Sequence, residues 1–462
     1  MPKAAFHNLG CKVNAYETEA MEQQLKGRGY EIVPFDEDAD VYIVNTCSVT
    51  NIADRKSRQM LHRAKKKNPS ALVVAVGCYA QVAADELEKD PSVDIIIGNN
   101  QKSRLWEILE DQKTAGGSGT YLEDIAAEKS CEPLRLESRG EHTRAFIKVQ
   151  DGCNQFCSYC IIPYARGRVR SRSPQDVEDE IRSLAEKGYK EAVLTGIHLS
   201  SYGTERMEGG PIRGGDWDCR ELISLIERVH EIPGLERIRL GSLEPRIITR
   251  EFAGALQGLP KFCPHFHLSL QSGCDSVLKR MNRHYTTEDY ARRCGIIREY
   301  FPDAAITTDV IVGFPGETEE EFRATEKFVE DVHFYEMHIF KYSRRAGTRA
   351  AAMPGQVPEP VKAERSAALL KLGDDMSREF RKRFLGRRLK VLFEETEEAD
   401  GRLCMVGYTP EYVKAALDLE AEGLSEAEAR ARFGGKIVPV RALALGAGGD
   451  AIFCGSGLEV CV

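Results

Sequence analysis

The sequence predicts an α/β protein with an N-terminal open parallel-sheet domain, a central partial (β/α)6 barrel and a small C-terminal β-barrel. Its 462 residues suffice for two or three domains. Short apolar strands alternate with amphipathic helices as far as residue 372, a pattern typical of parallel sheets covered by helices. Beyond that residue, short apolar segments are separated by glycine-rich turns, which favour a small β-barrel.

The N-terminal domain is expected to span residues 1–115 and to be followed by a polar linker over residues 116–140. Its strands and helices alternate along the chain, as a parallel sheet requires. Strands are predicted at Ala4–Leu9, Asp40–Asn45, Leu72–Val76 and Asp94–Ile97, and helices at Tyr16–Arg28, Ile52–Lys67 and Ala80–Lys89.

A cysteine follows each of the first three strands: Cys11, Cys47 and Cys78. The carboxyl ends of parallel strands line the ligand crevice of an open α/β sheet, and neighbouring strands lie about 4.8 Å apart. The three thiols are therefore predicted to converge on one ligand, an iron–sulfur cluster. Packing as a small hydrophobic residue explains one such cysteine easily, but explains three in succession poorly.

The central domain is expected over residues 141–372, with six strand–helix units and its active site at the carboxyl ends of the strands. Polar residues and glycines follow the predicted strands, as a ligand-binding face requires. Strands are predicted at Phe146–Gln150, Ala192–Thr195, Arg237–Leu240, Phe266–Leu270, Ile306–Val312 and His338–Lys341, with helices such as Pro174–Lys187 and Thr318–Val332 between them.

Three further cysteines, Cys153, Cys157 and Cys160, follow the first strand of this domain with C-x3-C-x2-C spacing. Three thiolates can hold three corners of a [4Fe–4S] cube and leave the fourth iron open to a substrate or cofactor. The spacing alone leaves two other uses open: a zinc site with a distant fourth ligand, and a disulfide with a spare thiol. No Cys or His follows within ten residues to complete a zinc site.

The composition predicts a cytoplasmic protein that has no contact with a membrane. No apolar run reaches membrane-spanning length, and the N-terminus lacks the apolar core of a signal peptide. Fourteen cysteines without an export signal are more typical of metal-binding or catalytic thiols than of disulfides. The net charge of −8 gives no overall indication of nucleic acid, so any RNA binding requires local basic patches.

The segments around the cysteines resemble known families. The spacing of Cys153, Cys157 and Cys160 and the neighbouring Tyr159 are similar to the radical S-adenosylmethionine (SAM) superfamily. The runs Leu9-Gly-Cys-Lys-Val-Asn, Asn45-Thr-Cys-Ser-Val-Thr-Asn and Val76-Gly-Cys-Tyr-Ala-Gln resemble the N-terminal domain of the methylthiotransferases. Together with Ser242-Leu-Glu-Pro, they look most like the branch that acts on C2 of N6-threonylcarbamoyladenosine beside the anticodon of tRNA.

This resemblance implies two [4Fe–4S] clusters, one on each cysteine triad, and two equivalents of SAM per turnover. One SAM methylates sulfur at the auxiliary cluster of Cys11, Cys47 and Cys78, and the other yields a 5'-deoxyadenosyl radical at the cluster of the second triad. The expected partners are a tRNA anticodon stem-loop, a reductant such as flavodoxin or ferredoxin, and a sulfur donor. The residues expected to contact SAM are Tyr159, Thr195, Gly196, Ser242, Glu244, Ser269, Gln271, Asp309 and Gly313.

The C-terminal domain, expected over residues 373–462, resembles the TRAM domain, a nucleic-acid-binding module. Its strands are predicted at Lys390–Phe393, Leu403–Tyr408, Ile437–Leu443 and Ala451–Cys454, with a charge-rich, helix-like insertion over Ala415–Phe433 that has no assigned function.

Three basic segments are candidates for contact with RNA phosphates, which position RNA without reading its sequence. Arg378–Lys390 carries seven basic residues and one acidic residue, and residues 55–67 could extend the same surface. The alternating residues Arg166, Arg168, Arg170 and Arg172 would share one face of an extended segment and could meet a phosphate or carboxylate. A solvated charged surface explains each segment equally simply.

Two other functions remain open. A sibling methylthiotransferase would act on isopentenyladenosine in tRNA or on a ribosomal-protein aspartate. A non-catalytic iron–sulfur protein that senses redox state would bind RNA without cleaving SAM. A cobalamin-dependent enzyme is disfavoured because the first domain lacks an Asp-x-His-x-x-Gly motif.

Overall fold

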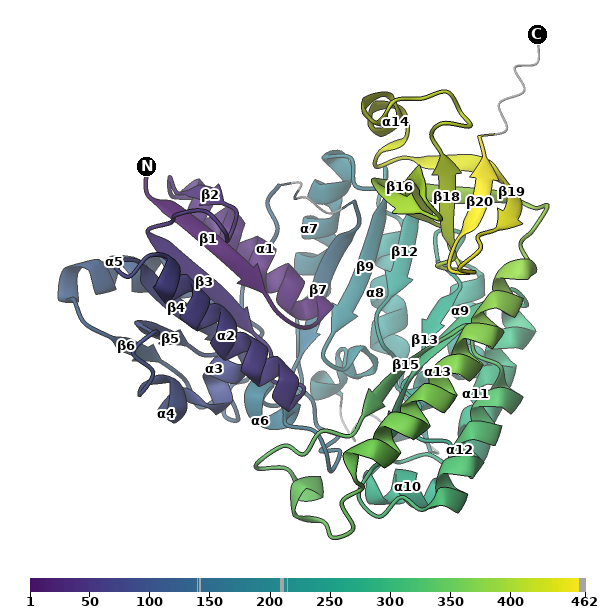
Figure 1. Cartoon of the computed structure of the whole chain (residues 1–462), viewed down its shortest axis with the longest axis horizontal. Helices are drawn as coiled ribbons and strands as arrows, with labels where there is room; N and C mark the ends of the chain where they lie inside the picture. The colour runs from purple at the N-terminus through teal and green to yellow at the C-terminus, as the bar shows by residue number, and fades with distance from the viewer. Residues whose placement is uncertain (139, 141–142, 208–211, 214, 457–462) are drawn as a thin grey trace.

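The computed structural model describes residues 1–138, 140, 143–207, 212–213 and 215–456, arranged as three domains along the chain (Figure 1). The predicted start of the central domain at residue 141 lies outside the described residues. No helix among the described residues is long and apolar enough to cross a membrane.

The first domain is an open parallel sheet of strand order β2-β1-β3-β4-β5-β6. Helices α1 and α5 cover one face of the sheet, and α2, α3 and α4 cover the other, so both faces are buried. The elements are β1 (Lys3–Asn8), α1 (Lys12–Gly27), β2 (Glu31–Val33), β3 (Val41–Thr46), α2 (Asn51–Lys67), β4 (Leu72–Gly77), α3 (Cys78–Val82), α4 (Ala84–Leu87), β5 (Ile95–Ile97), α5 (Leu105–Ala115) and β6 (Gly119–Tyr121).

Two details of this domain differ from the prediction. Strand β6 lies in the predicted linker and pairs with β5, although its polar, glycine-containing sequence gives no apolar strand pattern. The predicted helix Ala80–Lys89 is divided into α3 and α4 at Ala83, whose backbone is not helical.

The central domain is a partial barrel of six parallel strands in the order β7-β9-β12-β13-β14-β15. Isolated parallel bridges, Ile238 to Phe262 and Leu243 to Leu268, join the segments that contain β12 and β13, and β8 adds a short antiparallel edge to β7. The strands are β7 (Ala145–Asp151), β8 (Arg170–Ser171), β9 (Glu191–Gly196), β10 (Ile212–Arg213), β11 (Asp216–Trp217), β12 (Arg237–Leu240), β13 (His265–His267), β14 (Ala305–Val312) and β15 (Glu336–Lys341). The helices are α6 (Ile162–Arg166), α7 (Pro174–Glu186), α8 (Arg220–His230), α9 (Arg250–Gln257), α10 (Asp275–Arg280), α11 (Thr287–Tyr300) and α12 (Glu319–Val332).

The long helix α13 (Glu359–Lys382) runs along the barrel and leads into a closed β-barrel of order β16-β17-β18-β20-β19 (Figure 1). The first part of the predicted insertion is strand β18, because Ala415, Ala416 and Leu417 are fully buried between β17 and β20. The alanine-rich sequence suggested a helix there, but only α14 is helical. The elements are β16 (Arg388–Ala399), β17 (Arg402–Tyr408), β18 (Lys414–Asp418), α14 (Glu426–Phe433), β19 (Ile437–Leu445) and β20 (Ile452–Gly455).

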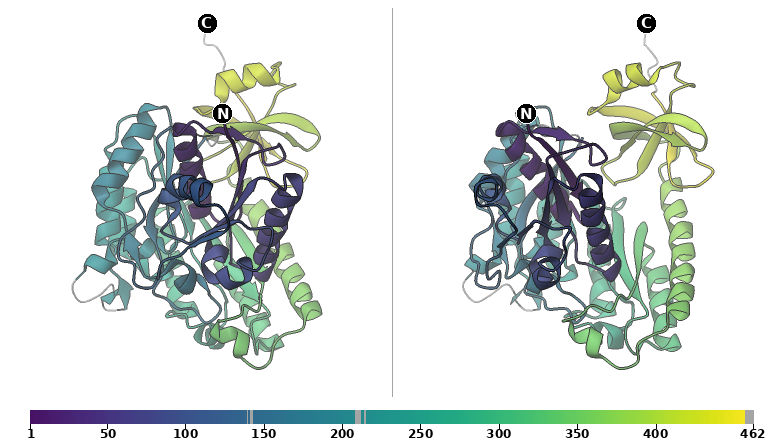
Figure 2. Two further views of the ribbon diagram at one scale, coloured as in Figure 1. Left: turned by 90° about the vertical axis from the view of Figure 1, so that its left-hand side faces the viewer. Right: turned by 60° about the vertical axis from the view of Figure 1, so that its left-hand side comes forward.

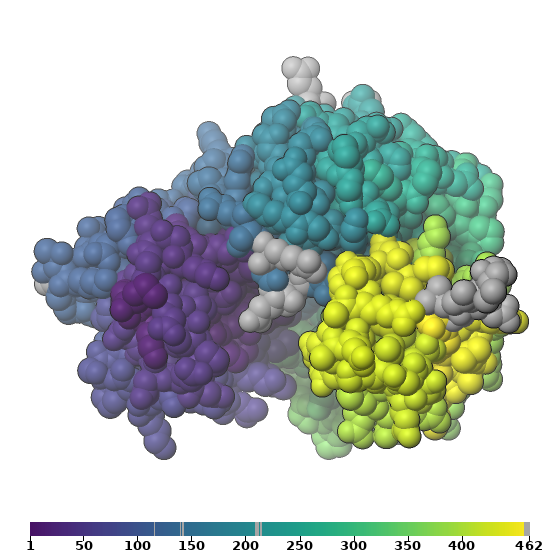
Figure 3. Space-filling view, turned by 90° about the horizontal axis from the view of Figure 1, so that it is seen from above, coloured from purple at the N-terminus to yellow at the C-terminus, as the bar shows by residue number. Residues whose placement is uncertain are grey.

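The first domain lies across the open side of the central barrel (Figure 2). At one edge, Tyr16 of α1 donates a hydrogen bond to the carbonyl of Leu134 (2.6 Å) and contacts Glu180 of α7. At the other edge, Arg345, which follows β15, donates to Ser48 Oγ (2.6 Å) and pairs with Asp54. The carboxyl ends of the first sheet therefore face the interior of the barrel. Seen from above, a recess separates the first domain from the C-terminal barrel (Figure 3).

Candidate active site

The first cysteine triad lies at the carboxyl ends of β1, β3 and β4, three adjacent strands of the first sheet. Gly10 precedes Cys11 with a φ of +107°, a conformation that favours glycine. A Cβ atom at Gly10 would lie 2.8 Å from the Sγ of Cys47. Only glycine therefore lets the loops that carry Cys11 and Cys47 approach this closely.

The thiols of this triad are held in an environment that disfavours their charged form. Burial, followed by the neighbouring Cys78, raises the pKa of Cys47 to about 12. Cys11 is accessible to solvent, but the protein around it still raises the pKa of its thiol through desolvation. A bound metal centre would displace these protons, since thiolates are the metal-binding form.

The second triad occupies the loop after β7. The Asn282 side chain donates to the carbonyl of Phe156 (3.0 Å), and the Ser158 amide donates to the carbonyl of Met281 (3.0 Å). These two hydrogen bonds attach the loop to the segment that follows α10. Arg283 donates to the Sγ of Cys157 (3.3 Å) and places a positive charge beside the triad. Burial, opposed by one backbone hydrogen bond, raises the pKa of Cys153 to about 12.

Neither triad has the compact geometry of a single-ion site. Among the described residues, the only three potential ligands whose donor atoms all lie within 4.8 Å of one another are His267, Asp309 and His338. Ligands of one zinc ion must converge on a single point, whereas ligands of different corners of a cube diverge. Two separate sets of three thiols, each more widely spaced, fit [4Fe–4S] cubes better than zinc.

A buried ionic network connects the two triads. Arg166, which is fully buried, donates Nε–H to the Sγ of Cys78 at 3.1 Å. Its two terminal nitrogens bond Glu17 of α1 at 2.9 and 3.0 Å, and Nη1 also reaches both oxygens of Asp151 at 3.2 Å. Asp151 stands two residues before Cys153, so one guanidinium contacts the first triad and the base of the second loop.

Two lysines complete this network. Lys148 contacts Glu17 and Asp151, each at 2.6 Å, and Lys102 lies 3.3 Å from Glu17. Although burial opposes ionisation, Arg166 and the two lysines hold the pKa of Glu17 well below its usual range. Burial likewise opposes the charge of Asp151, but Lys148 and Arg166 keep the pKa of its carboxyl low. The charged side chains of this network, at the boundary between the first domain and the barrel, are therefore paired with one another and buried away from solvent.

Most of the residues expected to contact SAM lie at one end of the barrel, because its six strands are parallel. Thr195 and Gly196 end β9, and the Tyr159 ring packs against Phe314 at 6.4 Å between ring centroids. Ser242 is exposed, and the Glu244 carboxylate accepts a hydrogen bond from Arg246 at 2.8 Å. The backbone carbonyl of Ser269 accepts a hydrogen bond from the Tyr285 hydroxyl, and Gln271 has a φ of +71°.

Two of these residues have surroundings that the sequence did not suggest. Asp309 lies inside β14, within the predicted strand Ile306–Val312, and its carboxylate bonds His267 at 3.2 Å. Gly313 has a φ of +71°, but a Cβ there would meet Lys362 at 2.3 Å, so a side chain of α13 already fills that space. Contact of either residue with SAM stays a prediction.

Sequence reasoning missed several residues at this site. Arg283 lies in no motif. Glu17 stands near the first cysteine run and Asp151 directly before the second, but nothing in the sequence indicated that both pair with Arg166. His198 is not among the residues expected to contact SAM. Burial, then Arg283 and Arg246, lower its pKa to about 3, and its buried Nε2 has no hydrogen-bond partner among the described residues.

The basic segments are only partly available to RNA. Of the alternating arginines, Arg166, Arg170 and Arg172 are buried and only Arg168 is exposed, because β8 folds this stretch into the barrel edge. Near α13, Arg381 bonds Glu336, while Arg383 and Arg387 bond Asp303. Within residues 55–67 and 378–390, the basic side chains that have no hydrogen bond or ion pair with a described residue are Arg55, Lys56, Lys66, Lys67, Lys382, Arg388 and Lys390.

Two family models match the chain. The model described as Uncharacterized protein family UPF0004 matches residues 3–98, and the radical SAM superfamily model matches residues 147–329. Each match contains one cysteine triad. Among solved structures, the radical SAM methyltransferase TsrM from Kitasatospora setae, with cobalamin and a [4Fe–4S] cluster bound, has a TM-score of 0.55 at 17% identity and covers 76% of this chain and 74% of its own. This likeness shows the fold.

Curated relatives are similar over most of the chain. The threonylcarbamoyladenosine tRNA methylthiotransferase MtaB of Bacillus subtilis (strain 168) is 41% identical and covers 90% of this chain and 90% of its own. MtaB of Aquifex aeolicus is 40% identical over 92% of this chain and 98% of its own. The tRNA-2-methylthio-N(6)-dimethylallyladenosine synthase of Caldicellulosiruptor saccharolyticus is 38% identical over 83% of this chain and 80% of its own.

Proposed function

The chain belongs to the family of radical SAM tRNA methylthiotransferases, and we propose that it transfers a methylthio group to C2 of N6-threonylcarbamoyladenosine beside the anticodon. The product is 2-methylthio-N6-threonylcarbamoyladenosine. The observation that carries this proposal is the pair of thiol triads on facing strand ends, joined by Arg166. A redox-sensing RNA-binding protein would need no second triad beside the first.

Cys11, Cys47 and Cys78 would hold an auxiliary [4Fe–4S] cluster, and Cys153, Cys157 and Cys160 the cluster that binds SAM. When bound, these cofactors supply SAM cleavage to a radical and the sulfur and methyl groups that are transferred. The chain supplies the positions: Arg283 holds positive charge beside Cys157, and Arg166 does so beside Cys78. SAM itself would lie along the strand ends that carry Tyr159, Thr195, Gly196, Ser242, Glu244, Ser269, Gln271 and Gly313, with Asp309 deeper in the barrel.

The tRNA would enter through the recess between the first domain and the C-terminal barrel (Figure 3). Unpaired basic residues of α2 and of the start of β16 stand on these two domains and can contact phosphates. Base chemistry requires the target nucleotide to leave its stack and enter the barrel. The reaction would also need a low-potential reductant, such as flavodoxin or ferredoxin, and a sulfur donor. We propose that the enzyme acts on tRNA in the cytoplasm.

Mass spectrometry of tRNA nucleosides tests the proposal. Cells that lack the native activity would express the protein or its Cys153→Ala variant. We expect 2-methylthio-N6-threonylcarbamoyladenosine only with the unaltered protein. A methylthio product on dimethylallyladenosine instead would assign the protein to the sibling tRNA branch, and methylthio-aspartate without a tRNA product would assign it to the protein-modifying branch.

A further inference from the structure

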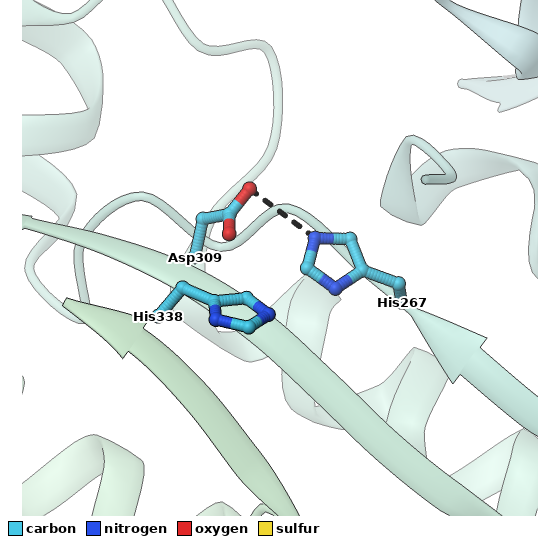
Figure 4. A group of neighbouring side chains, drawn as sticks. All are labelled: His267, Asp309 and His338. Atoms are coloured by element: carbon cyan, nitrogen blue, oxygen red, sulfur yellow. Dashed lines mark hydrogen bonds and ion pairs between the residues drawn. The ribbon is translucent and has the colours of Figure 1, made fainter. Parts of the chain in front are cut away.

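Three polar side chains stand together on the inner wall of the central barrel: His267 of β13, Asp309 of β14 and His338 of β15 (Figure 4). Side chains alternate between the two faces of a strand. In β14, Ile306, Val310 and Val312 pack into the core beneath the helices. Asp309 therefore points the opposite way, into the space that the first domain covers, and His338, its register partner, points there too.

Two hydrogen bonds hold the His267 ring in place. Its Nδ1 lies 3.0 Å from Thr307 Oγ1, and its Nε2 lies 3.2 Å from Asp309 Oδ2. A carboxylate oxygen only accepts, so the Nε2–H of His267 donates to Asp309. This arrangement orients the Asp309 carboxylate and leaves its second oxygen free to accept from a ligand.

The imidazole of His338 lies beside this carboxylate, since one ligand atom each of His267, Asp309 and His338 lie within 4.8 Å of one another. His338 is exposed, its ring centroid lies 5.8 Å from that of His267, and its side chain has no hydrogen bond or ion pair within the described part of the chain.

The two candidate nucleosides differ in the hydrogen-bonding groups that they present to Asp309 and His338. A dimethylallyl group has no hydrogen-bonding atom, so it would bury the His338 imidazole and the second carboxylate oxygen of Asp309 without partners. A threonylcarbamoyl group offers a carboxylate, a hydroxyl and N–H groups. A site built to hydrogen-bond such groups rejects an analogue that lacks them, because its own polar atoms are left unpaired.

We propose that His338 binds the carboxylate of the threonylcarbamoyl group, while Asp309, oriented by His267, accepts a hydrogen bond from its hydroxyl or N–H. The inference rests on the proposed function and names the residues that select its substrate. The triad thus acts in recognition of the nucleoside, separately from the cysteine triads.

Binding without reductant, where no turnover occurs, tests this proposal. The cluster-loaded protein would be titrated with labelled anticodon stem-loops that carry threonylcarbamoyladenosine, dimethylallyladenosine or unmodified adenosine. We expect the unaltered protein to prefer the first by at least about tenfold, since each lost charge-assisted contact costs about that factor. His338→Ala and Asp309→Asn should bring the preference close to one.

The matched control is His62→Ala, which removes an exposed histidine whose Nε2 lies 2.7 Å from Asp90 in the first domain. It should keep the full preference. A preference that survives in His338→Ala, or that is absent from the unaltered protein, would overturn the proposal. If nucleoside mass spectrometry still finds the threonylcarbamoyl product in that case, the function stands and only the recognition site is wrong.

A metal ion is the other occupant that two histidines and a carboxylate could hold. The cluster-loaded protein would therefore be titrated with Co²⁺ and followed by visible absorption. Binding of one Co²⁺ that is lost in His338→Ala and is not displaced by the modified stem-loop would also overturn the proposal. We expect no such binding.

Discussion

Arg166 donates its Nε–H to the Sγ of Cys78 at 3.1 Å across the boundary between the first domain and the central barrel. The same guanidinium bonds Asp151, two residues before Cys153. Burial opposes its charge, but Cys78, Glu17 and Asp151 raise the pKa of Arg166 well above its usual value. One buried cation thus contacts a cysteine of the first triad and the base of the loop that carries the second.

Arg166→Ala should be strongly destabilising because it leaves the buried carboxylates of Glu17 and Asp151 short of a partner. Loss of one partner from a buried pair costs about 3–5 kcal/mol. The measurement is the free energy of unfolding in urea. Arg168→Ala is the control, since Arg168 is exposed and lies over the Phe156 ring at 4.6 Å; it should cost at most about 1 kcal/mol. Equal effects of the two substitutions would contradict the network.

Substitutions in the two triads should separate two activities. Cys153→Ala should abolish reductive cleavage of SAM, because three thiolates are needed to hold its cluster. Cys47→Ala should impair sulfur insertion more than SAM cleavage. The measurements are 5'-deoxyadenosine formation and the methylthio nucleoside in the same reaction. Equal SAM cleavage by the unaltered protein and Cys153→Ala would refute the assignment.

Gly10→Ala should selectively disturb the first triad. The added Cβ would lie 2.8 Å from Cys47 Sγ, at a φ of +107° that disfavours any side chain. We expect loss of about half of the bound iron, with SAM cleavage retained at the second triad. The control is Gly27→Ala, where no atom lies within 4 Å of the added Cβ. Full iron content in Gly10→Ala would show that this close approach is not required.

Glu191 should make the contact between the two barrels sensitive to acid. Burial opposes its charge, but Arg239, Arg144 and Arg237 lower the pKa of its carboxyl. Arg239 also bonds the carbonyls of Thr409 and Pro410 in the C-terminal domain. A lowered pKa stabilises the fold above the unfolded value of about 4.3, and this stabilisation is lost as pH falls through the folded value.

Glu191→Gln should therefore be less stable than the unaltered protein at pH 6.5, because Arg239 is left without its carboxylate. The difference should shrink as the pH is lowered below about 4, since protonation removes the same charge in the unaltered protein. Urea midpoints across this pH range check the prediction. A difference that is constant with pH would show that the charge of Glu191 is not the stabilising feature.

Motifs and periodicity were sufficient for the fold class and for the family, which the comparisons confirm. Cys11, Cys47 and Cys78 could be placed together because parallel strands bring their carboxyl ends to one edge. Strand β6 and strand β18 could not be predicted, because their residues pair through the backbone without an apolar alternation. Arg166 could not be separated from Arg168 by sequence, since only packing decides which of two alternating arginines is buried.

The most direct test of the account uses purified, cluster-loaded protein with tRNA that contains N6-threonylcarbamoyladenosine and SAM labelled with deuterium in its methyl group. The account predicts 2-methylthio-N6-threonylcarbamoyladenosine that carries the labelled methyl group, together with at least one 5'-deoxyadenosine for each product. Cleavage of SAM without a labelled methylthio nucleoside would contradict it.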